Sequence, residues 1–122
     1  MRPSRYLLLA LWPVVAFAQD ATTAMVDGDG VVMRGLDKMS SKVVEFSIGV
    51  GQTVAFERLE IKLDACLYTD GDIGGEAVAL IEIRDIREAE PRFKGWMFGS
   101  SPALSALDHP RYDVWVINCT KS

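Results

Sequence analysis

The chain has 122 residues, of which 25% are charged, and its formal net charge at pH 7 is −4. A chain of this length is expected to form one compact domain. Its acidic balance excludes the strong electrostatic footprint of a DNA- or RNA-binding protein, and it offers no basic patch for direct binding to lipid head groups.

Residues 1–18 have the pattern of an export signal. Arg2 and Arg5 give a positive start, an apolar run extends from Tyr6 to Ala18, and polar sequence begins at Gln19. The run is shorter than the about 20 apolar residues that a membrane-spanning helix needs. We therefore expect a signal peptide that is cleaved after Ala18, and the alternative is a segment retained as an N-terminal tether.

Residues 19–30 are small, polar and rich in Gly and Asp, which predicts a flexible leader before a single β domain over 31–122. Within that domain, apolar residues alternate with polar ones in short stretches separated by Gly-, Asp- and Ser-rich turns. The stretches are 31–36, 44–48, 54–56, 61–68, 77–86, 93–98 and 112–119. The pattern predicts an all-β fold, a small antiparallel sandwich or barrel of about seven strands.

One short helix is expected before the last strand. Ser101 is a good N-cap residue, Pro102 suits the first helical position, and Leu104 and Leu107 would lie on one apolar side. The helix should end at His109, because the residue before a proline is forced out of the α region.

The chain has two Cys residues, Cys66 and Cys119, and both follow the expected signal peptide. An even number of Cys residues in a chain that is expected to be exported predicts one disulfide bond. A redox pair would more often have the spacing Cys-x-x-Cys, so a structural role is favoured. In the last strand, Trp115 and Ile117 are expected to share a face with Cys119 and to point into the core. The opposite face of this strand is also apolar, with Tyr112, Val114 and Val116, so we expect it to be buried by another sheet, by the Pro102–Leu107 segment or by a partner protein.

Residues of hydrolase type gather at 100–109, namely Ser100, Ser101, Asp108 and His109. The nucleophile motif Gly-x-Ser-x-Gly is absent, and nothing in the sequence identifies a partner that would orient the imidazole. We therefore expect no catalytic residues, and we expect His109 to lie in a turn, where it bonds to backbone carbonyls. On this interpretation, its replacement by Ala has a modest effect on stability.

The loop from Asp70 to Glu76 resembles the start of a calcium-binding loop, but position twelve is Ile81, where that motif has a bidentate Glu. A Gly/Asp turn between strands is the favoured interpretation, and weak calcium binding is the alternative. No other cofactor or metal site is indicated by the spacing of ligand-type residues.

Several longer motifs resemble a known family. They are Arg34–Lys38, Val50–Val54, Cys66, Gly95–Phe98, Ser100–Leu104, His109-Pro110, Tyr112–Trp115 and Cys119. In this order they are similar to an uncharacterised family of small exported proteins of alphaproteobacteria, known as domain of unknown function 2155. The resemblance implies a periplasmic domain without assigned catalytic residues. It also implies an accessory role at respiratory complex I (NADH:quinone oxidoreductase), on the periplasmic face of its membrane arm.

The sequence and the resemblance together predict a non-catalytic periplasmic interaction module, without a cofactor, that stabilises an inner-membrane complex. Association with the membrane would come through the partner or an uncleaved N-terminal segment. The expected contact residues are Trp96, Met97, Phe98, Pro102, Leu104, Leu107 and Tyr112. The alternative is a free periplasmic domain that binds a small ligand or an envelope polymer, for which an open groove between Trp96 and Trp115 would be evidence.

Overall fold

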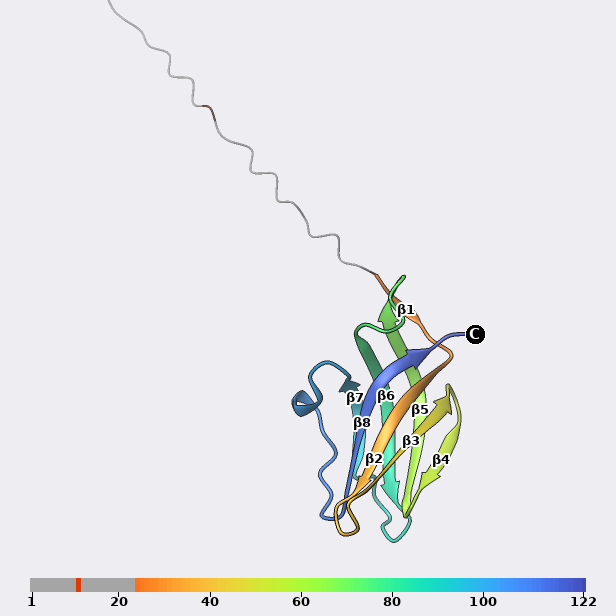
Figure 1. Cartoon of the computed structure of the whole chain (residues 1–122), viewed down its shortest axis with the longest axis vertical. Helices are drawn as coiled ribbons and strands as arrows, with labels where there is room; N and C mark the ends of the chain where they lie inside the picture. The colour runs from red at the N-terminus through yellow and green to blue at the C-terminus, as the bar shows by residue number, and fades with distance from the viewer. Residues whose placement is uncertain (1–10, 12–23) are drawn as a thin grey trace, which may run out of the picture.

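The computed structural model describes Leu11 and residues 24–122, so the expected signal peptide and the first part of the expected leader lie outside the described residues. Figure 1 shows strands that form two layers, with the connection between the last two strands running down one side. The elements are β1 (Met25–Asp27), β2 (Gly30–Asp37), β3 (Lys42–Gly49), β4 (Thr53–Phe56), β5 (Leu59–Thr69), β6 (Ala77–Asp85), β7 (Phe93–Phe98), the 3-10 turn η1 (Pro102–Leu104) and β8 (Tyr112–Thr120).

Every strand pairing is antiparallel. The five-stranded sheet has the order β1-β5-β6-β7, with β4 also pairing with β5, and the three-stranded sheet has the order β3-β2-β8. The prediction of an all-β antiparallel sandwich is confirmed, with eight strands rather than about seven.

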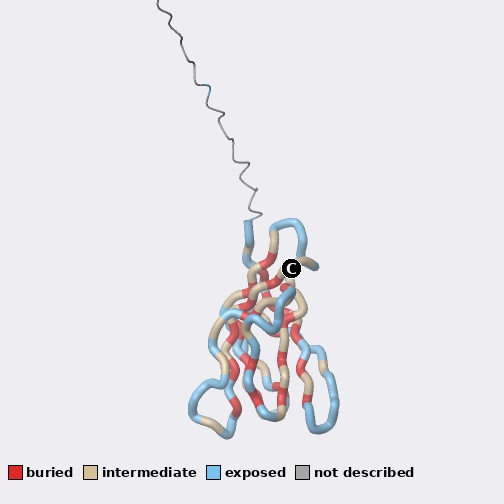
Figure 2. The backbone as a smooth tube through the Cα atoms, turned by 90° about the vertical axis from the view of Figure 1, so that its left-hand side faces the viewer, coloured by how far each residue is buried: buried red, intermediate tan, exposed pale blue. Residues whose placement is uncertain are grey.

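The core lies between the two sheets and is built from alternate residues of each strand. Met33 of β2, Leu63 of β5 and Ile81 of β6 are fully buried or nearly so, while their sequence neighbours are more exposed. Figure 2 shows this alternation as buried segments along the strands and exposed loops at both ends. Burial of such side chains contributes about 1.5–3 kcal/mol each, so this layer is the main stabilising element of the fold.

The strand that the sequence analysis missed is β1, which lies within the expected leader. Val26 of β1 pairs with Tyr68 of β5, and the Gly28 N–H then donates to the Cys66 carbonyl, with the nitrogen and oxygen 2.7 Å apart. The next residue, Asp29, donates its N–H to Thr120 of the other sheet at 2.7 Å. The chain therefore crosses from one sheet to the other at residues 28–29, and the ordered domain begins before residue 31.

The face assignment in the last strand was wrong. Tyr112, Val114 and Val116 are buried in the core together with Cys119, whereas Trp115 is only partly buried. The cause is a β-bulge: Val32 pairs with Asn118 but Met33 pairs with Val116, so Ile117 has no counterpart in β2. The extra residue reverses the alternation, because residues on either side of it no longer differ by an even number.

The expected helix is shorter than predicted. η1 is a single 3-10 turn closed by a bond of 3.0 Å from the Leu104 N–H to the Ser101 carbonyl, and the Ser101 side chain makes no capping bond. Ser105 is already extended, with φ −151°, so the segment up to Leu107 is not helical. Among the residues that the structure describes, no helix is long and apolar enough to cross a bilayer.

Candidate interaction site

An apolar groove of about 320 Å³ runs along the open side of the sandwich, between β8 and the segment that follows η1. Asp113 is the one titratable residue among those that line it. The lining residues are Met97, Phe98, Pro102, Ala103, Ser105, Ala106, Leu107, Asp113, Val114, Trp115 and Val116. We call this site the β8 groove. Its lining can take up an apolar partner but holds no pair of groups for acid–base chemistry.

Three elements position the groove. Met97 points from β7 into the core, and Leu107 is buried against the same region from the connecting segment. Trp115 projects from the other face of β8, so its indole borders the groove at the edge of the three-stranded sheet. The groove therefore has a buried apolar floor and an aromatic rim.

Two exposed apolar side chains belong to the same part of the chain. Leu104 of η1 is 75% exposed, and Trp96 of β7 is 37% exposed on the face opposite Met97. Leu104 lies between two residues that line the groove, Ala103 and Ser105, and an exposed apolar side chain beside an apolar groove is typical of a contact surface.

The structure brings together most of the predicted contact residues but not all of them. Met97, Phe98, Pro102 and Leu107 line the groove, whereas Trp96 and Leu104 do not line it and remain exposed. Tyr112 was assigned wrongly, since it is 1% exposed and belongs to the core. Its burial has the same cause as the misassigned face, because the bulge in β8 turns Tyr112 inward.

Sequence reasoning missed the part of the groove that β8 contributes. Val114 and Val116 line it because β8 is the edge strand of its sheet, and Trp115, which the sequence analysis named for the alternative function, lines it without Trp96. An alternating apolar pattern does not reveal which strand lies at an edge, so no signal in the sequence could have identified these residues.

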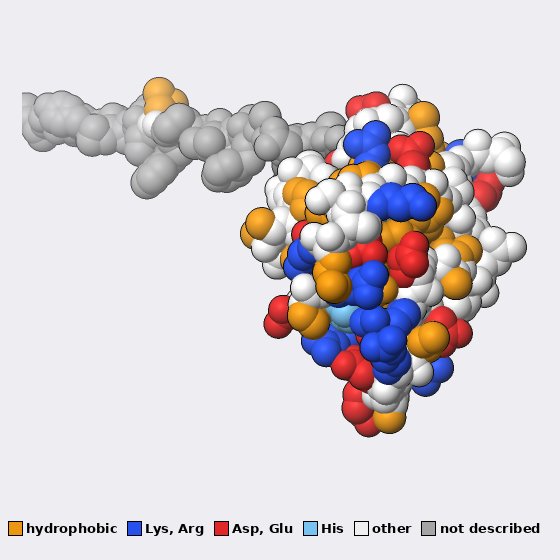
Figure 3. All heavy atoms as spheres, turned by 60° about the horizontal axis from the view of Figure 1, so that its bottom comes forward, with side chains coloured by type: hydrophobic (Ala, Val, Ile, Leu, Met, Phe, Trp, Pro, Cys, Tyr) orange, Lys and Arg blue, Asp and Glu red, His pale blue; other side chains and the backbone are white. Residues whose placement is uncertain are grey.

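A cluster of charged side chains and one histidine lies at the end of the molecule where β2 and β6 end and β8 begins. We call it the polar end cluster; its members are Asp37, Arg58, Asp85, His109 and Arg111. Figure 3 shows this end, where Lys and Arg side chains surround the small exposed part of the imidazole.

Hydrogen bonds engage both ring nitrogens of His109. Nδ1 accepts the backbone N–H groups of Arg111 at 3.0 Å and Tyr112 at 3.2 Å, and Nε2 lies 2.9 Å from Oδ2 of Asp85. Because Nδ1 is an acceptor, Nε2 carries the proton and donates it to Asp85. The prediction that the imidazole bonds to backbone carbonyls was wrong, since its backbone partners are N–H groups.

The carboxylate of Asp85 is held in its charged form. The backbone N–H of Arg87 donates to it at 2.9 Å, and together with His109 and the nearby Arg58 this lowers the pKa of Asp85 despite its burial. The Arg58 guanidinium carbon also lies 5.4 Å from the centre of the Tyr112 ring. These contacts engage both the imidazole and the carboxylate in structural hydrogen bonds, so neither is a base that is free to take a proton, while Nε of Arg58 is buried without a hydrogen-bond partner among the described residues.

The second pair in the cluster joins Asp37 to Arg111. Nη2 and Nε of Arg111 lie 3.0 and 3.2 Å from Oδ2 and Oδ1 of Asp37, and the N–H of Met39 donates to the same carboxylate. The Arg111 hydrogen bonds lower the pKa of Asp37 to about 2. This ion pair ties the end of β2 to the start of β8.

The residues of hydrolase type do not form a triad. His109 bonds to Asp85 rather than to its neighbour Asp108, and the Ser100 hydroxyl donates to Glu76. In the loop that follows β5, Asp72 and Gly75 take part in successive turns. Within residues 24–122, no three His, Cys, Asp or Glu side chains come together as a possible metal site.

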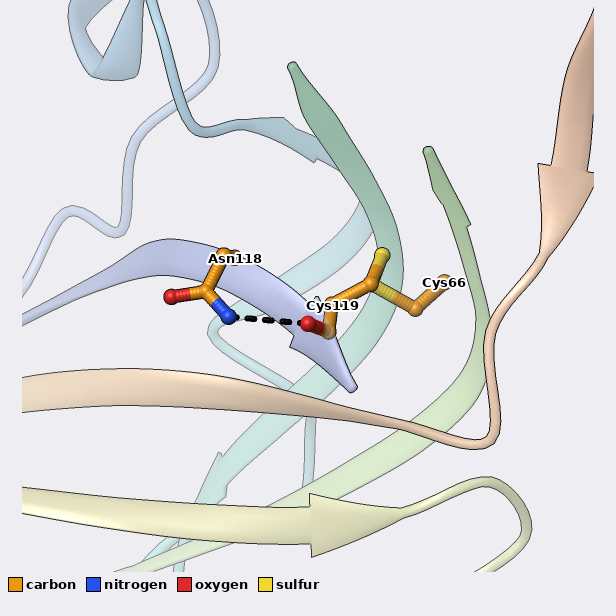
Figure 4. Close-up of a disulfide and its surroundings, with 3 residues drawn as sticks. All are labelled: Cys66, Asn118 and Cys119. Atoms are coloured by element: carbon orange, nitrogen blue, oxygen red, sulfur yellow. Dashed lines mark hydrogen bonds between the residues drawn. A yellow bond between two sulfur atoms is a disulfide. The ribbon is translucent and has the colours of Figure 1, made fainter. Parts of the chain in front are cut away.

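The predicted disulfide is present. Cys66 of β5 and Cys119 of β8 are bonded, with their Cα atoms 5.9 Å apart, and the bridge joins the two sheets. Figure 4 shows the bridge and the neighbouring Asn118, whose Nδ2 donates to the Cys119 carbonyl at 2.8 Å.

Comparison with known proteins agrees with the family resemblance. The chain is 28% identical over 87 residues to an uncharacterised protein of Rickettsia prowazekii, and the match covers 69% of this chain and 56% of the relative. The chain thus matches little more than half the length of that protein. No solved structure matches it significantly. A family model described as "Uncharacterized protein conserved in bacteria (DUF2155)" matches residues 31–119, which is most of the described domain, and the chain therefore belongs to the DUF2155 family.

Proposed function

We propose that this protein is an exported, non-catalytic interaction module that stabilises a membrane complex by binding one of its subunits. The observation that carries the proposal is the β8 groove, an apolar site of about 320 Å³ with the exposed Leu104 beside it. An apolar surface of this kind is costly to leave in water and is typical of a protein contact.

The distribution of titratable groups supports a binding role over a catalytic one. The buried imidazole of His109 has both nitrogens engaged, and the groove is lined by one carboxylate, that of Asp113. A general base must be within reach of a substrate proton, and a nucleophile needs such a base beside it. Neither arrangement is found among the residues that line the groove.

The export signal pattern and the disulfide between Cys66 and Cys119 both support an oxidising compartment, which in an alphaproteobacterium is the periplasm. The resemblance described above makes respiratory complex I the first candidate partner, with the module on the periplasmic face of its membrane arm. The acidic charge of the chain agrees with attachment through a protein rather than through anionic lipids.

Affinity purification from native membranes in mild detergent tests this proposal. The full chain should recover subunits of one membrane complex. Leu104→Asp, next to the groove, should weaken the recovery, whereas Ile86→Asp should not, since Ile86 is an exposed apolar residue of the β6–β7 loop. If the unchanged chain recovers no membrane-complex subunit, the proposal is wrong.

A free periplasmic domain that binds a small ligand or an envelope polymer is the second candidate. The volume of the β8 groove favours it, because about 320 Å³ lies within the range of about 300–1,000 Å³ found for small-molecule sites. Mass spectrometry of the protein purified from the periplasm under native conditions separates the two candidates. A bound small molecule that Trp115→Ala removes, without a recovered membrane subunit, would favour the ligand-binding domain.

A further inference from the structure

The outer face of the five-stranded sheet, which points away from the core, has a charged half and an apolar half. In the charged half, Glu82 of β6 lies between Lys62 of β5 and Lys94 of β7, as expected for a sheet with one face in water. In the apolar half, two rows of paired residues cross the same three strands. One row is Leu67, Val78 and Phe98, and the other is Ala65, Leu80 and Trp96. We call these two rows the outer apolar face.

The side chains of the outer apolar face point toward solvent. Ala79 and Met97 are buried in the core, and because successive residues of a strand point to opposite faces, Leu80 and Trp96 point outward. Trp96 is 37% exposed, and the exposed Met25 extends the face onto β1. Apolar surface that is continuous over three strands is costly to leave in water and marks an interaction site.

The charged side chains at the end of this face away from its charged half are acidic. Asp27 of β1 pairs with Leu67, and the exposed Asp70 and Asp72 follow in the loop after β5. In the part of the chain that the structure describes, none of these three carboxylates forms an ion pair. Lys and Arg are absent from the three chain segments that meet here, which are 24–33, 65–83 and 95–110. This edge is therefore complementary to positive charge on a partner.

We propose that the outer apolar face binds the protein partner through an apolar surface of that partner that is edged with Lys or Arg. The inference rests on the proposed function, and it adds a second contact surface and the chemistry that fits it. Phe98 belongs to the outer apolar face and also lines the β8 groove, so one partner can contact both. A second copy of this chain fits less well, because it would bring a formal charge of −4 and the same acidic edge to the contact.

Photo-crosslinking in intact cells tests what covers this face. In the full chain, the photoreactive residue p-benzoylphenylalanine replaces Trp96 or, as a matched control, the exposed Arg84, which lies on the charged half of the same face. The Trp96 position should give an adduct with a membrane-complex subunit, in a peptide with apolar residues beside Lys or Arg, and the Arg84 position should give none. An adduct of the chain with itself, an adduct with an acidic peptide, or no adduct at Trp96 would overturn the proposal.

Substitutions separate this inference from the proposed function. Trp96→Glu should lower the recovery of the partner from native membranes at least about tenfold, whereas Thr53→Glu, which adds the same charge on the charged half, should not. The double variant Asp27→Lys and Asp72→Lys leaves the apolar rows intact and should lower the recovery as well, so the test holds if Trp96→Glu does not fold. If Leu104→Asp loses the partner while all of these variants keep it, the interaction role stands and the outer-face contact is wrong. If the unchanged chain recovers no subunit, the proposed function itself is wrong.

Discussion

The imidazole Nε2 of His109 lies 2.9 Å from Oδ2 of Asp85, and this contact ties the residue before Pro110 to the end of β6. It therefore links the three-stranded sheet, through the start of β8, to the five-stranded sheet. The disulfide between Cys66 and Cys119 links the same two sheets near the far end of β8 (Figure 4). The sandwich is thus fastened at both ends, once by a buried polar contact and once by a covalent bond.

Replacement of His109 by Ala should lower the free energy of unfolding by about 2–4 kcal/mol, which is more than the sequence alone suggests. The change removes the hydrogen bonds that His109 makes to the buried Tyr112 N–H and to Oδ2 of Asp85, and each buried group that loses its bond costs about 1–3 kcal/mol. Urea unfolding measures the effect. Asp108→Ala, at the exposed neighbouring position, should stay within about 0.5 kcal/mol; equal effects of the two changes would contradict the assigned network.

The ion pair of Asp37 and Arg111 should make part of the protein's free energy of unfolding depend on pH in the acidic range. Arg111 lowers the pKa of Asp37 in the folded state from 3.8 to about 2. Because the folded-state pKa is the lower one, the pair stabilises the protein above the unfolded pKa, and this stability is lost as the pH falls from about 4 to about 2. In stability-versus-pH curves from urea unfolding, Asp37→Asn should flatten that part, whereas Asp70→Asn in an exposed loop should not. Unchanged curves for Asp37→Asn would show that the pair is not formed.

The disulfide should contribute a large share of the stability. Cys66 and Cys119 are 53 residues apart, and in the chain-entropy model a loop of this size corresponds to about 4 kcal/mol. Reduction should lower the free energy of unfolding, measured by urea denaturation, by an amount of this order. The unreduced, unfolded chain should contain no free thiol. A variant with both Cys residues replaced by Ala should not respond to the reductant. Two reactive thiols in the unreduced chain would refute the bond.

Gly35 should not tolerate a side chain. A Cβ atom at this position of β2 would lie 2.7 Å from the ring of Phe56, which is held between Phe46 and Tyr112 with ring centres 5.7 Å away on each side. Gly35→Ala should therefore lower stability by about 1–3 kcal/mol through overpacking. The matched control is Gly95→Ala in β7, where the nearest atom would be 4.0 Å away, so thermal unfolding should change little.

Local alternation of apolar and polar residues was sufficient to predict the longer strands. The stretch 93–98 coincides with β7, and the stretch 112–119 covers nearly all of β8, because a strand that is buried on one face must repeat with a period of two. The three residues of β1 are too few to show such a period. Their pairing with β5 depends on where the chain crosses between the sheets at Gly28, which is a tertiary feature.

By itself, the sequence determined the all-β class and the disulfide, because alternation is a local property and two Cys residues leave one possible pairing. Only the tertiary structure decided which face of β8 is buried, since the bulge at Ile117 depends on the register with β2. It also decided that His109 pairs with Asp85, 24 residues away, and that β8 is an edge strand. Contacts between distant residues follow from how the sheets pack, and no local pattern encodes them.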